Sequence, residues 1–230
     1  MDDHSAGPAA AHLPVIVVPG SPLLVPELAG VPGDPDADAV RAAAVDAARW
    51  LAARALRWVV VADGGGDRPG TDEPASTDDV AGAAPGTVGT FAGFGAPVPV
   101  ALAGPAPSDP ATATPGWPTP LLVAAWLRGA VATPERAPQL VGRGGGPDGV
   151  VFVLDGPITL TPRAPGGHRP EDVAVFDALV ASVVDGLGPV GSVLPTWDAA
   201  AEACRGRAVT ELYRGAPFGV GYLVATAEAP

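Results

Sequence analysis

The stretch VIVVPGSPLLVPELAG, residues 15–30, gives the first indication of the fold class. Its first four residues are apolar and β-branched, which favours a strand over a helix. Because no polar residue marks either face, Leu13–Val18 is predicted to be a strand buried on both sides, as strands of parallel sheets are. The strand runs into Pro19-Gly20-Ser21-Pro22, which predicts a rigid turn. Such a turn presents a side chain at the edge of a sheet, and the question is which side chain would carry chemistry there.

A helix and a second strand follow this segment. Residues 36–57, DADAVRAAAVDAARWLAARALR, predict an alanine-rich helix for which Asp34 or Asp36 can supply the N-cap. Arginines gather toward the end of the run, where the helix dipole favours positive charge. Residues 58–62, WVVVA, predict a second buried strand. Strand, helix and strand in this order form a right-handed βαβ unit and indicate the α/β class.

The remaining apolar segments extend the alternation of strands and helices. The clearest helical pattern covers Glu171–Asp185, with apolar positions at Val173, Phe176, Leu179, Val180, Val183 and Val184. Further predictions are strands at 97–103 and 150–154, a helix at 120–131 capped by Thr119 with Leu122, Val123 and Trp126 toward the core, a helix from Thr196 or Asp198 to Arg205, and paired strands at 208–213 and 220–225. We expect a flexible tail at 1–12 and one α/β domain at 13–227, with a central, largely parallel or mixed sheet flanked by helices.

Two segments rich in Gly and Pro interrupt this pattern, at 63–97 and at 103–118. Loops of this length in a compact domain are functional or disordered. The glycines after the second strand, ADGGGDRPGT, invite comparison with a phosphate-binding loop. The chain has no Lys for such a loop, Pro69 stands where the dinucleotide fingerprint needs a third Gly, and Asp63 and Asp67 would repel a phosphate. The pattern therefore favours a plain flexible loop.

Composition narrows the class of partner. The net charge is −12, with 13 Arg as the only cations besides His, and nucleic acid is not an expected partner because phosphate binding needs a basic face. The single cysteine, Cys204, excludes an internal disulfide and every multi-Cys zinc site. The N-terminus is acidic and no apolar run approaches the ~18 residues of a membrane span, so we expect a cytoplasmic protein without a membrane partner. A homo-oligomer stays open.

Few side chains are suited to catalysis. Serine hydrolases present the nucleophile in a Gly-x-Ser-x-Gly elbow, which the chain lacks, and Ser21 has no predicted base. A non-heme iron(II) site typically needs two His and one carboxylate. His4 lies in the tail, and His12 precedes the first strand at the edge opposite the turn. His168 lies on a loop before a helix, where the default expectation is an exposed side chain and a ligand role is the alternative. Cys204 is expected to be a buried apolar residue.

Three segments, in order, resemble one known family. They are VPGSPLLVPELAG (18–30), LTPRAPGGHRPEDVAVFDALV (160–180) and ELYRGAPFGVGYLVA (211–225). They are similar to the Cys-Pro-His-Pro-Pro-Leu-Leu-Val-Pro-Glu, Leu-Thr-Pro-x-Ala-Pro and Tyr-x-x-Pro-(Phe/Tyr)-Gly-Val-Gly-Tyr segments of the class III extradiol ring-cleavage dioxygenases. This is the LigB-like superfamily, which also contains the Memo-like proteins. The resemblance implies an α/β sheet with an iron(II) site at strand ends that opens catechol-type rings with dioxygen.

The resemblance also assigns the site residues, and several of them are altered. The first metal His of the family falls on Gly20, and the His after the second strand falls near Gly64, which follows Asp63. The family segment Ser-Gly-Asp-Leu-Ser-His falls on VLDGPI, which keeps Asp155 and has Ile158 in place of the catalytic His. Glu202, two residues before Cys204, falls near a Glu-x-Cys-like stretch and is the candidate surviving carboxylate.

Two functions follow from these residues. The first is a degenerate, metal-free relative that acts as a small-molecule-binding, subunit or scaffold protein, with no cofactor and a small aromatic molecule as the possible ligand. Its remnant cleft would be lined by Gly20, Ser21, Asp63, Gly64, Asp155 and Ile158. The second is an active metal-dependent oxygenase or hydrolase, with Fe(II) or another metal held by an altered set: Asp63, Asp155, His168 and Glu202. Glycine and isoleucine cannot bind iron or carry a proton, which favours the first function.

Overall fold

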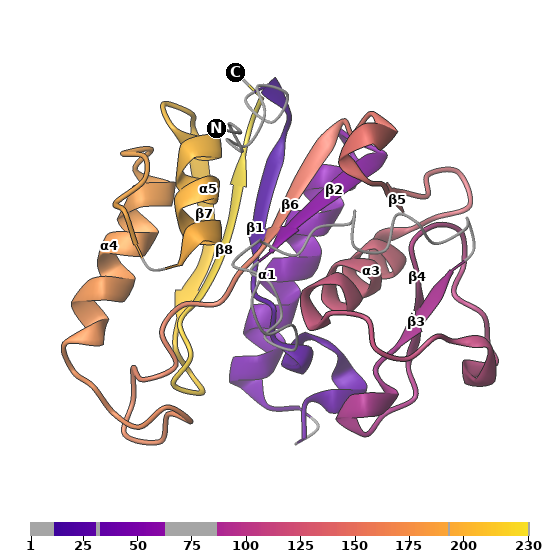
Figure 1. The fold of residues 1–230 in the computed structure, drawn as a ribbon, viewed down its shortest axis with the longest axis horizontal. Helices are drawn as coiled ribbons and strands as arrows, with labels where there is room; N and C mark the ends of the chain where they lie inside the picture. The colour runs from indigo at the N-terminus through magenta and orange to yellow at the C-terminus, as the bar shows by residue number, and fades with distance from the viewer. Residues whose placement is uncertain (1–11, 31–32, 63–86, 193, 230) are drawn as a thin grey trace, which may run out of the picture.

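The computed structural model describes residues 12–30, 33–62, 87–192 and 194–229, which form three layers (Figure 1). A central sheet lies between α4 and α5 on the left of Figure 1 and α1 and α3 on the right. Its strands are β1 (Val15–Val18), β2 (Arg57–Ala62), β5 (Gln139–Leu140), β6 (Gly149–Val153), β7 (Val209–Gly215) and β8 (Tyr222–Ala227). The helices are α1 (Pro35–Ala52), α3 (Thr119–Val131), α4 (Asp172–Val184) and α5 (Pro195–Cys204). A small second sheet pairs β3 (Val88–Thr90) with β4 (Pro99–Ala101).

Short 3-10 helices occupy several of the connections. They are η2 (Pro22–Leu24), η3 (Pro26–Leu28), η4 (Ala92–Phe94), η5 (Pro110–Thr112) and η6 (Arg143–Gly145). The first of them follows the turn after β1, and Ser21 caps it by accepting a hydrogen bond from the backbone N–H of Leu23. The proline-bounded segment after the first strand is therefore a compact double turn rather than a further strand.

The central sheet has the order β5-β2-β6-β1-β8-β7. The first four strands are parallel, and antiparallel pairing joins β8 to β1 and β7 to β8. This confirms the predicted α/β fold with a largely parallel or mixed sheet flanked by helices. Because β6 lies between β1 and β2, the crossover through α1 passes over one strand instead of joining neighbours.

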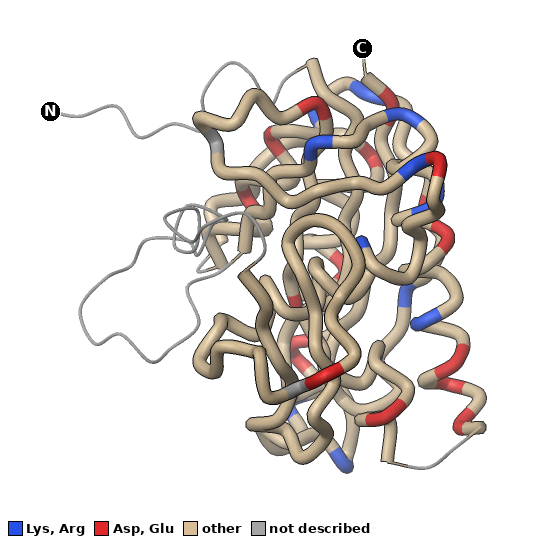
Figure 2. The backbone as a smooth tube through the Cα atoms, turned by 90° about the vertical axis from the view of Figure 1, so that its right-hand side faces the viewer, with Lys and Arg blue, Asp and Glu red and all other residues tan. Residues whose placement is uncertain are grey.

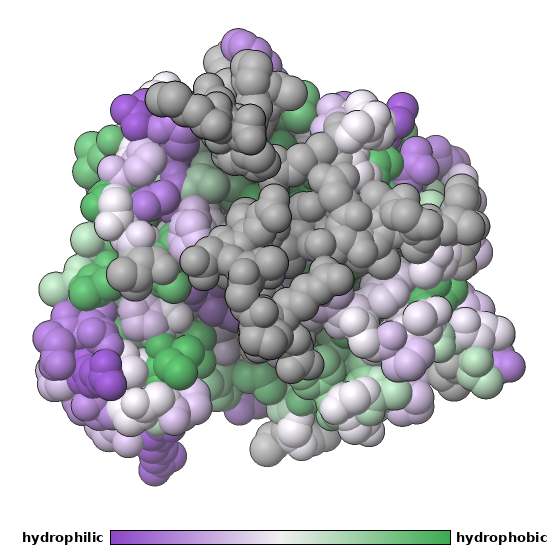
Figure 3. Space-filling view, viewed as in Figure 1, coloured by the Kyte–Doolittle hydropathy of each residue, from purple (hydrophilic) through white to green (hydrophobic). Residues whose placement is uncertain are grey.

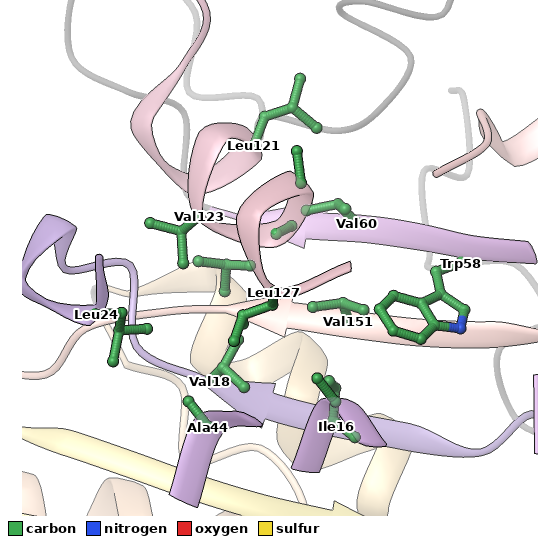
Figure 4. Close-up of a cluster of buried hydrophobic side chains, with 14 of the residues drawn as sticks. Ile16, Val18, Leu24, Ala44, Trp58, Val60, Leu121, Val123, Leu127 and Val151 are labelled. Carbon is green, nitrogen blue, oxygen red and sulfur yellow. The ribbon is translucent and has the colours of Figure 1, made fainter. Parts of the chain in front are cut away.

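The first strand is buried on both faces, as predicted. Ile16 and Val18 point into a cluster with α1 and α3, and Val15 and Val17 point into a second cluster with α4 and α5. Figure 4 shows the first cluster, where side chains of β1, β2 and β6 meet those of α1 and α3. Burying an aliphatic side chain of this size contributes about 1.5–3 kcal/mol, which is why an apolar run without alternation settles at the centre of the sheet.

Long-range contacts explain where α1 ends. Asp34 is its N-cap and accepts two backbone N–H hydrogen bonds of the first turn, at 2.9 and 3.3 Å. The predicted end at Arg57 is wrong, because the helix ends at Ala52. The backbone N–H groups of Leu56 and Arg57 donate to Asp148 Oδ1, at 2.9 and 2.6 Å, instead of to helix carbonyls. A carboxylate distant in sequence thus redirects the chain into β2.

The small sheet differs most from expectation. β3 lies inside the segment 63–97 that was predicted to be a polar loop, and that prediction is wrong for this strand. The predicted strand at 97–103 is reduced to β4, and the two-residue β5 was not predicted. A Cβ added to Gly89 would lie 2.5 Å from the Trp117 ring, so this strand depends on a packing contact that its short sequence does not reveal.

Some details of the predicted helices are also wrong. Pro118, without a side-chain hydrogen bond, is the N-cap of α3, and Thr119 is its first helical residue. Val173 is 43% exposed because it lies in the first turn of α4, where no described element covers it, while Phe176, Leu179, Val180 and Val183 are buried as predicted. The shorter helix begins at Pro195 rather than at Thr196 or Asp198. The helical period shows which face of a helix packs against the core, but it does not show how many turns of that face are covered by neighbouring elements.

Charged and apolar residues are mixed over the surface. In the view of Figure 2 the Arg positions are interspersed with Asp and Glu and form no broad basic face. Figure 3 shows hydrophobic and hydrophilic residues side by side on the face of Figure 1. The exposed large apolar residues among those described are Phe94, Ile158, Val173, Val175, Leu187, Val190 and Leu212. None of the described helices combines the length and the apolar character that crossing a membrane requires.

Candidate functional site

The sheet has a switch point between β1 and β6. These strands are parallel neighbours, but the chain leaves β1 toward α1 on one face and leaves β6 toward α4 on the other. In open α/β sheets, ligand sites form outside the carboxyl ends of strands at such a point. The turn after β1, the loop after β6 and the start of β8 meet there. We call this region the carboxyl edge, and its central residues are Gly20, Ser21, Asp155 and Tyr222.

Gly20 and Asp155 are in direct contact at this edge. The backbone N–H of Gly20 donates to Asp155 Oδ1 at 3.1 Å. A Cβ added to Gly20 would lie 3.1 Å from Asp155 Oδ2 and 3.5 Å from Val153 Cγ1. The carboxylate therefore occupies the space in front of Gly20, and a larger residue there would require the Asp155 side chain to move.

Ser21 is buried and hydrogen bonded, so it is not set up as a nucleophile. Its Oγ accepts from the backbone N–H of Leu23 at 3.3 Å and from the hydroxyl of Tyr222 at 3.3 Å. Burial raises the pKa of Tyr222, the nearby Asp155 and Tyr213 raise it further, and the hydrogen bond to Ser21 opposes the shift. Tyr222 is thus a protonated donor at neutral pH rather than a base. Within the described residues no His or carboxylate bonds to Ser21 Oγ.

Backbone hydrogen bonds join the loop after β6 to the segment before β8. The N–H of Gly156 donates to Gly221 O at 2.8 Å, and the N–H of Gly221 donates to Pro157 O at 3.0 Å. The N–H of Leu160 donates to Gly219 O at 3.0 Å. Ile158 lies on this loop and is half exposed, at 50%. The carboxyl edge is therefore built from segments that are far apart in sequence, with Leu160 bonded to Gly219 and Gly156 to Gly221.

The other candidate residues are distributed around the molecule. His168 is exposed on the loop after β6, and His12 is exposed before β1. Glu202 is exposed on α5 and forms an ion pair with Arg205 at 2.6 Å. His4, Asp63 and Gly64 lie outside the described residues. The structure brings together Gly20, Ser21 and Asp155, and it does not add Glu202 to them.

The direction of α5 explains why Glu202 is remote. Near the start of the helix, Trp197 Nε1 donates to the backbone carbonyl of Asp155 at 2.9 Å. Just beyond its end, Arg207 Nη1 donates to Leu13 O at 2.7 Å, at the opposite edge of the sheet. Cys204, in the last turn, is buried, and burial raises the pKa of its thiol to about 11 while Arg207 opposes the shift. This end of the helix carries no group suited to chemistry at the carboxyl edge.

The described residues at the carboxyl edge do not fit an iron(II) site. Glycine at position 20 and isoleucine at position 158 offer no ligand atom, and Asp155 accepts the Gly20 N–H. Across the described ranges no three His, Cys, Asp or Glu residues are grouped so as to hold a metal ion.

Comparison with protein-family models and with curated proteins finds no match for this chain. The function of this chain is therefore to be inferred from the geometry of the carboxyl edge and from the segments that form it.

Sequence reasoning missed Tyr222 and Trp197. Tyr222 belonged to a predicted strand, and its place opposite the turn after β1 depends on the β1/β8 register, which pairs Val17 with Ala225. Trp197 belonged to a predicted helix whose packing partner was unknown. The largely apolar run of β8 signals that Tyr222 lies in a buried strand, but no local signal gives the hydrogen-bond partner of either residue.

Proposed function

We propose that this chain is a class III extradiol dioxygenase-like protein that has lost the family's iron ligands and acts as a small-molecule-binding, subunit or scaffold protein. One observation carries the proposal. The three segments that resemble the family are far apart in sequence, yet they contact one another at the carboxyl edge. Hydrogen bonds link Tyr222 of the third segment to Ser21 of the first, and Leu160 of the second segment to Gly219 of the third. Resemblance confined to chance matches would have no reason to converge on the sheet's switch point.

The groups left at this edge favour a hydroxylated ligand. The Asp155 carboxylate accepts hydrogen bonds, and the Ser21 hydroxyl, which accepts from Tyr222, keeps its own proton to donate. The exposed Ile158 adds an apolar contact beside them. A small aromatic molecule with hydroxyl groups matches this combination of polar and apolar groups. We expect the protein to hold such a molecule without reacting with it.

A metal-dependent oxygenase or hydrolase is the second candidate. His168 and Asp155 lie on the same loop, which favours it, and Asp63 completes the set only beyond the described residues. Glu202 weighs against it, because it pairs with Arg205 on a helix that runs away from the edge. A set reduced to one His and one or two carboxylates would have to recruit further ligands.

Metal binding and turnover separate the two candidates. The purified chain is loaded anaerobically with Fe(II), bound iron per chain is measured, and catechol and 3,4-dihydroxybenzoate are added with oxygen. We expect no stoichiometric iron and no ring-opened product, but saturable binding of one of these catechols by calorimetry. Stoichiometric iron with ring opening would establish the second candidate instead.

Two matched carboxamide variants sharpen this test. Asp155→Asn alters the edge, and Glu202→Gln alters an exposed ion pair remote from it. The proposal expects weaker catechol binding for Asp155→Asn only, with no change of metal content in either variant. The metal-dependent alternative expects Asp155→Asn to lose bound metal, whereas Glu202→Gln keeps it. If the chain binds neither of the two catechols and no iron, both candidate functions are rejected.

A further inference from the structure

Two aromatic side chains lie beneath the carboxyl edge, on the face of α4 and α5. Trp197 is fully buried, and its indole Nε1 donates to the backbone carbonyl oxygen of Asp155 at 2.9 Å. Phe176 meets the Trp197 ring edge-on, with ring centroids 6.2 Å apart and an interplanar angle of 86°. Both rings belong to the cluster of α4 and α5, whereas Tyr222 belongs to the cluster of α1 and α3. The two rings therefore support the carboxyl edge from the face of the sheet opposite to the Tyr222 side chain.

The Phe176 ring also restricts which residues can pack against it, because two glycines lie directly on the ring. A Cβ added to Gly156 would lie 2.8 Å from the ring, and one added to Gly221 would lie 2.7 Å from it. These two glycines are joined by the backbone hydrogen bond from Gly156 N–H to Gly221 O, at 2.8 Å. The segments that carry Asp155 and Tyr222 are thus seated together on one aromatic surface.

We propose that Trp197, supported by Phe176, is the positioning residue of the candidate site. Its indole bond fixes the backbone of Asp155, and this holds the Asp155 carboxylate where the Gly20 N–H can donate to it. The biological meaning of this role rests on the proposed function, but the geometry can be tested without any ligand.

The chain contains a matched control in Trp58. This residue is also fully buried, and its Nε1 also donates to a backbone carbonyl, that of Ala55, at 3.0 Å. It lies at the start of β2, at the other edge of the sheet. Trp197→Phe and Trp58→Phe therefore remove the same donor and similar volume, at the site and away from it.

The first readout is the exchange rate of the Gly20 amide proton, followed by NMR at neutral pH. A hydrogen bond contributes about 1 kcal/mol, so Trp197→Phe is expected to accelerate this exchange about fivefold relative to the amides of β6. Trp58→Phe is expected to leave the ratio unchanged. An unchanged ratio in Trp197→Phe, or an equal acceleration in both variants, would overturn the proposal. If Trp197→Phe does not fold, Phe176→Leu keeps the indole bond and is expected to give a smaller acceleration, and no acceleration overturns the proposal.

The second readout is the ionisation of Tyr222, followed by tyrosinate absorbance. The chain has two tyrosines, so in a Tyr213→Phe background the signal reports Tyr222 alone. The charged and titratable neighbours that act on this pair are Asp155 on Tyr222 and Asp36 on Tyr213. Because Asp155 contributes to the raised pKa of Tyr222, displacing its carboxylate lowers the titration midpoint.

A double-mutant cycle tests whether Trp197 changes the Tyr222 titration midpoint through Asp155. Trp197→Phe is expected to lower the Tyr222 midpoint on its own and to add nothing in an Asp155→Asn background. Equal shifts in both backgrounds would show that Trp197 does not act through Asp155. A positive exchange result without catechol binding would leave the positioning role standing and reject the proposed function. Catechol binding without faster exchange of the Gly20 amide would support the proposed function and reject the positioning role of Trp197.

Discussion

The same kinds of hydrogen bond occur at the two edges of the central sheet, where the parallel strands begin and where they end, but they have different roles. At the amino edge, where the parallel strands β1, β2 and β6 begin, side chains bond to backbone groups. Asp148 accepts from Leu56 and Arg57, the Trp58 indole donates to Ala55 O, and Arg207 donates to Leu13 O. Each of these contacts holds a chain reversal in place and leaves no group directed at a ligand.

At the carboxyl edge, by contrast, functional groups from separate segments meet one another. Tyr222 donates to Ser21, and Asp155 faces the Gly20 N–H while its own backbone is held by an indole. The chain exits β1 and β6 toward opposite faces only at this edge. Topology, rather than residue type, therefore separates the stabilising edge from the candidate functional one.

The largest expected effect concerns Cys204, at the amino-edge end of α5. Its thiol pKa is raised from 9.0 to about 11 by burial, so folding favours the neutral thiol. This contribution is complete below pH 9 and is lost as pH rises through 11, which amounts to about 2 to 3 kcal/mol. Urea unfolding of wild type and Cys204→Ala over this range should show the steeper loss in wild type. Parallel stability curves would contradict a buried, neutral thiol.

The next effect tests the aromatic support of the carboxyl edge. Gly221→Ala places a methyl group against the Phe176 ring, and overpacking of this kind costs about 2 kcal/mol of unfolding free energy. Gly93→Ala, where nothing lies within 4 Å of the added Cβ, is the control and should be close to neutral. Phe176→Leu in the Gly221→Ala background should recover part of the loss. Equal chemical-denaturation midpoints for the two glycine variants would show that the ring does not press on Gly221.

The smallest effect tests whether the amino edge is purely structural. Asp148→Ala removes the acceptor of two backbone N–H groups, but Asp148 is exposed and water can replace it, so we expect a loss of about 1 kcal/mol. Asp148→Asn keeps an acceptor oxygen and should lose less. Neither variant should change catechol binding by calorimetry. A change in that binding would mean that the two edges are coupled.

Local patterns predicted much of the fold. The apolar runs at β1, β2 and β6 and the helical spacing in α4 identified the elements, because burial of a strand or a helix face leaves a periodic trace in the sequence. Short elements had no such trace. β3 and β5 depend on Trp117 packing and on pairing with β2, respectively, and neither contact can be inferred from two or three residues.

The candidate site was predictable only in part. Gly20, Ser21 and Asp155 follow strands that were predicted to be parallel, and carboxyl ends of parallel strands lie at one edge. Glu202 was grouped with them by resemblance, but the direction of α5 carries it away. Tyr222 and Trp197 reach the edge through the register of β8 and the packing of α5.

The amino-acid sequence alone specifies an α/β protein with buried strands, because VIVV at 15–18 is apolar on both faces and is buried between two helical layers. It also determined that position 20 offers no metal ligand. That β6 rather than β2 is the parallel neighbour of β1, and therefore where the switch point lies, became known from the three-dimensional structure. Strand order is fixed by pairing between distant segments, for which hydrophobic pattern alone specifies no partner.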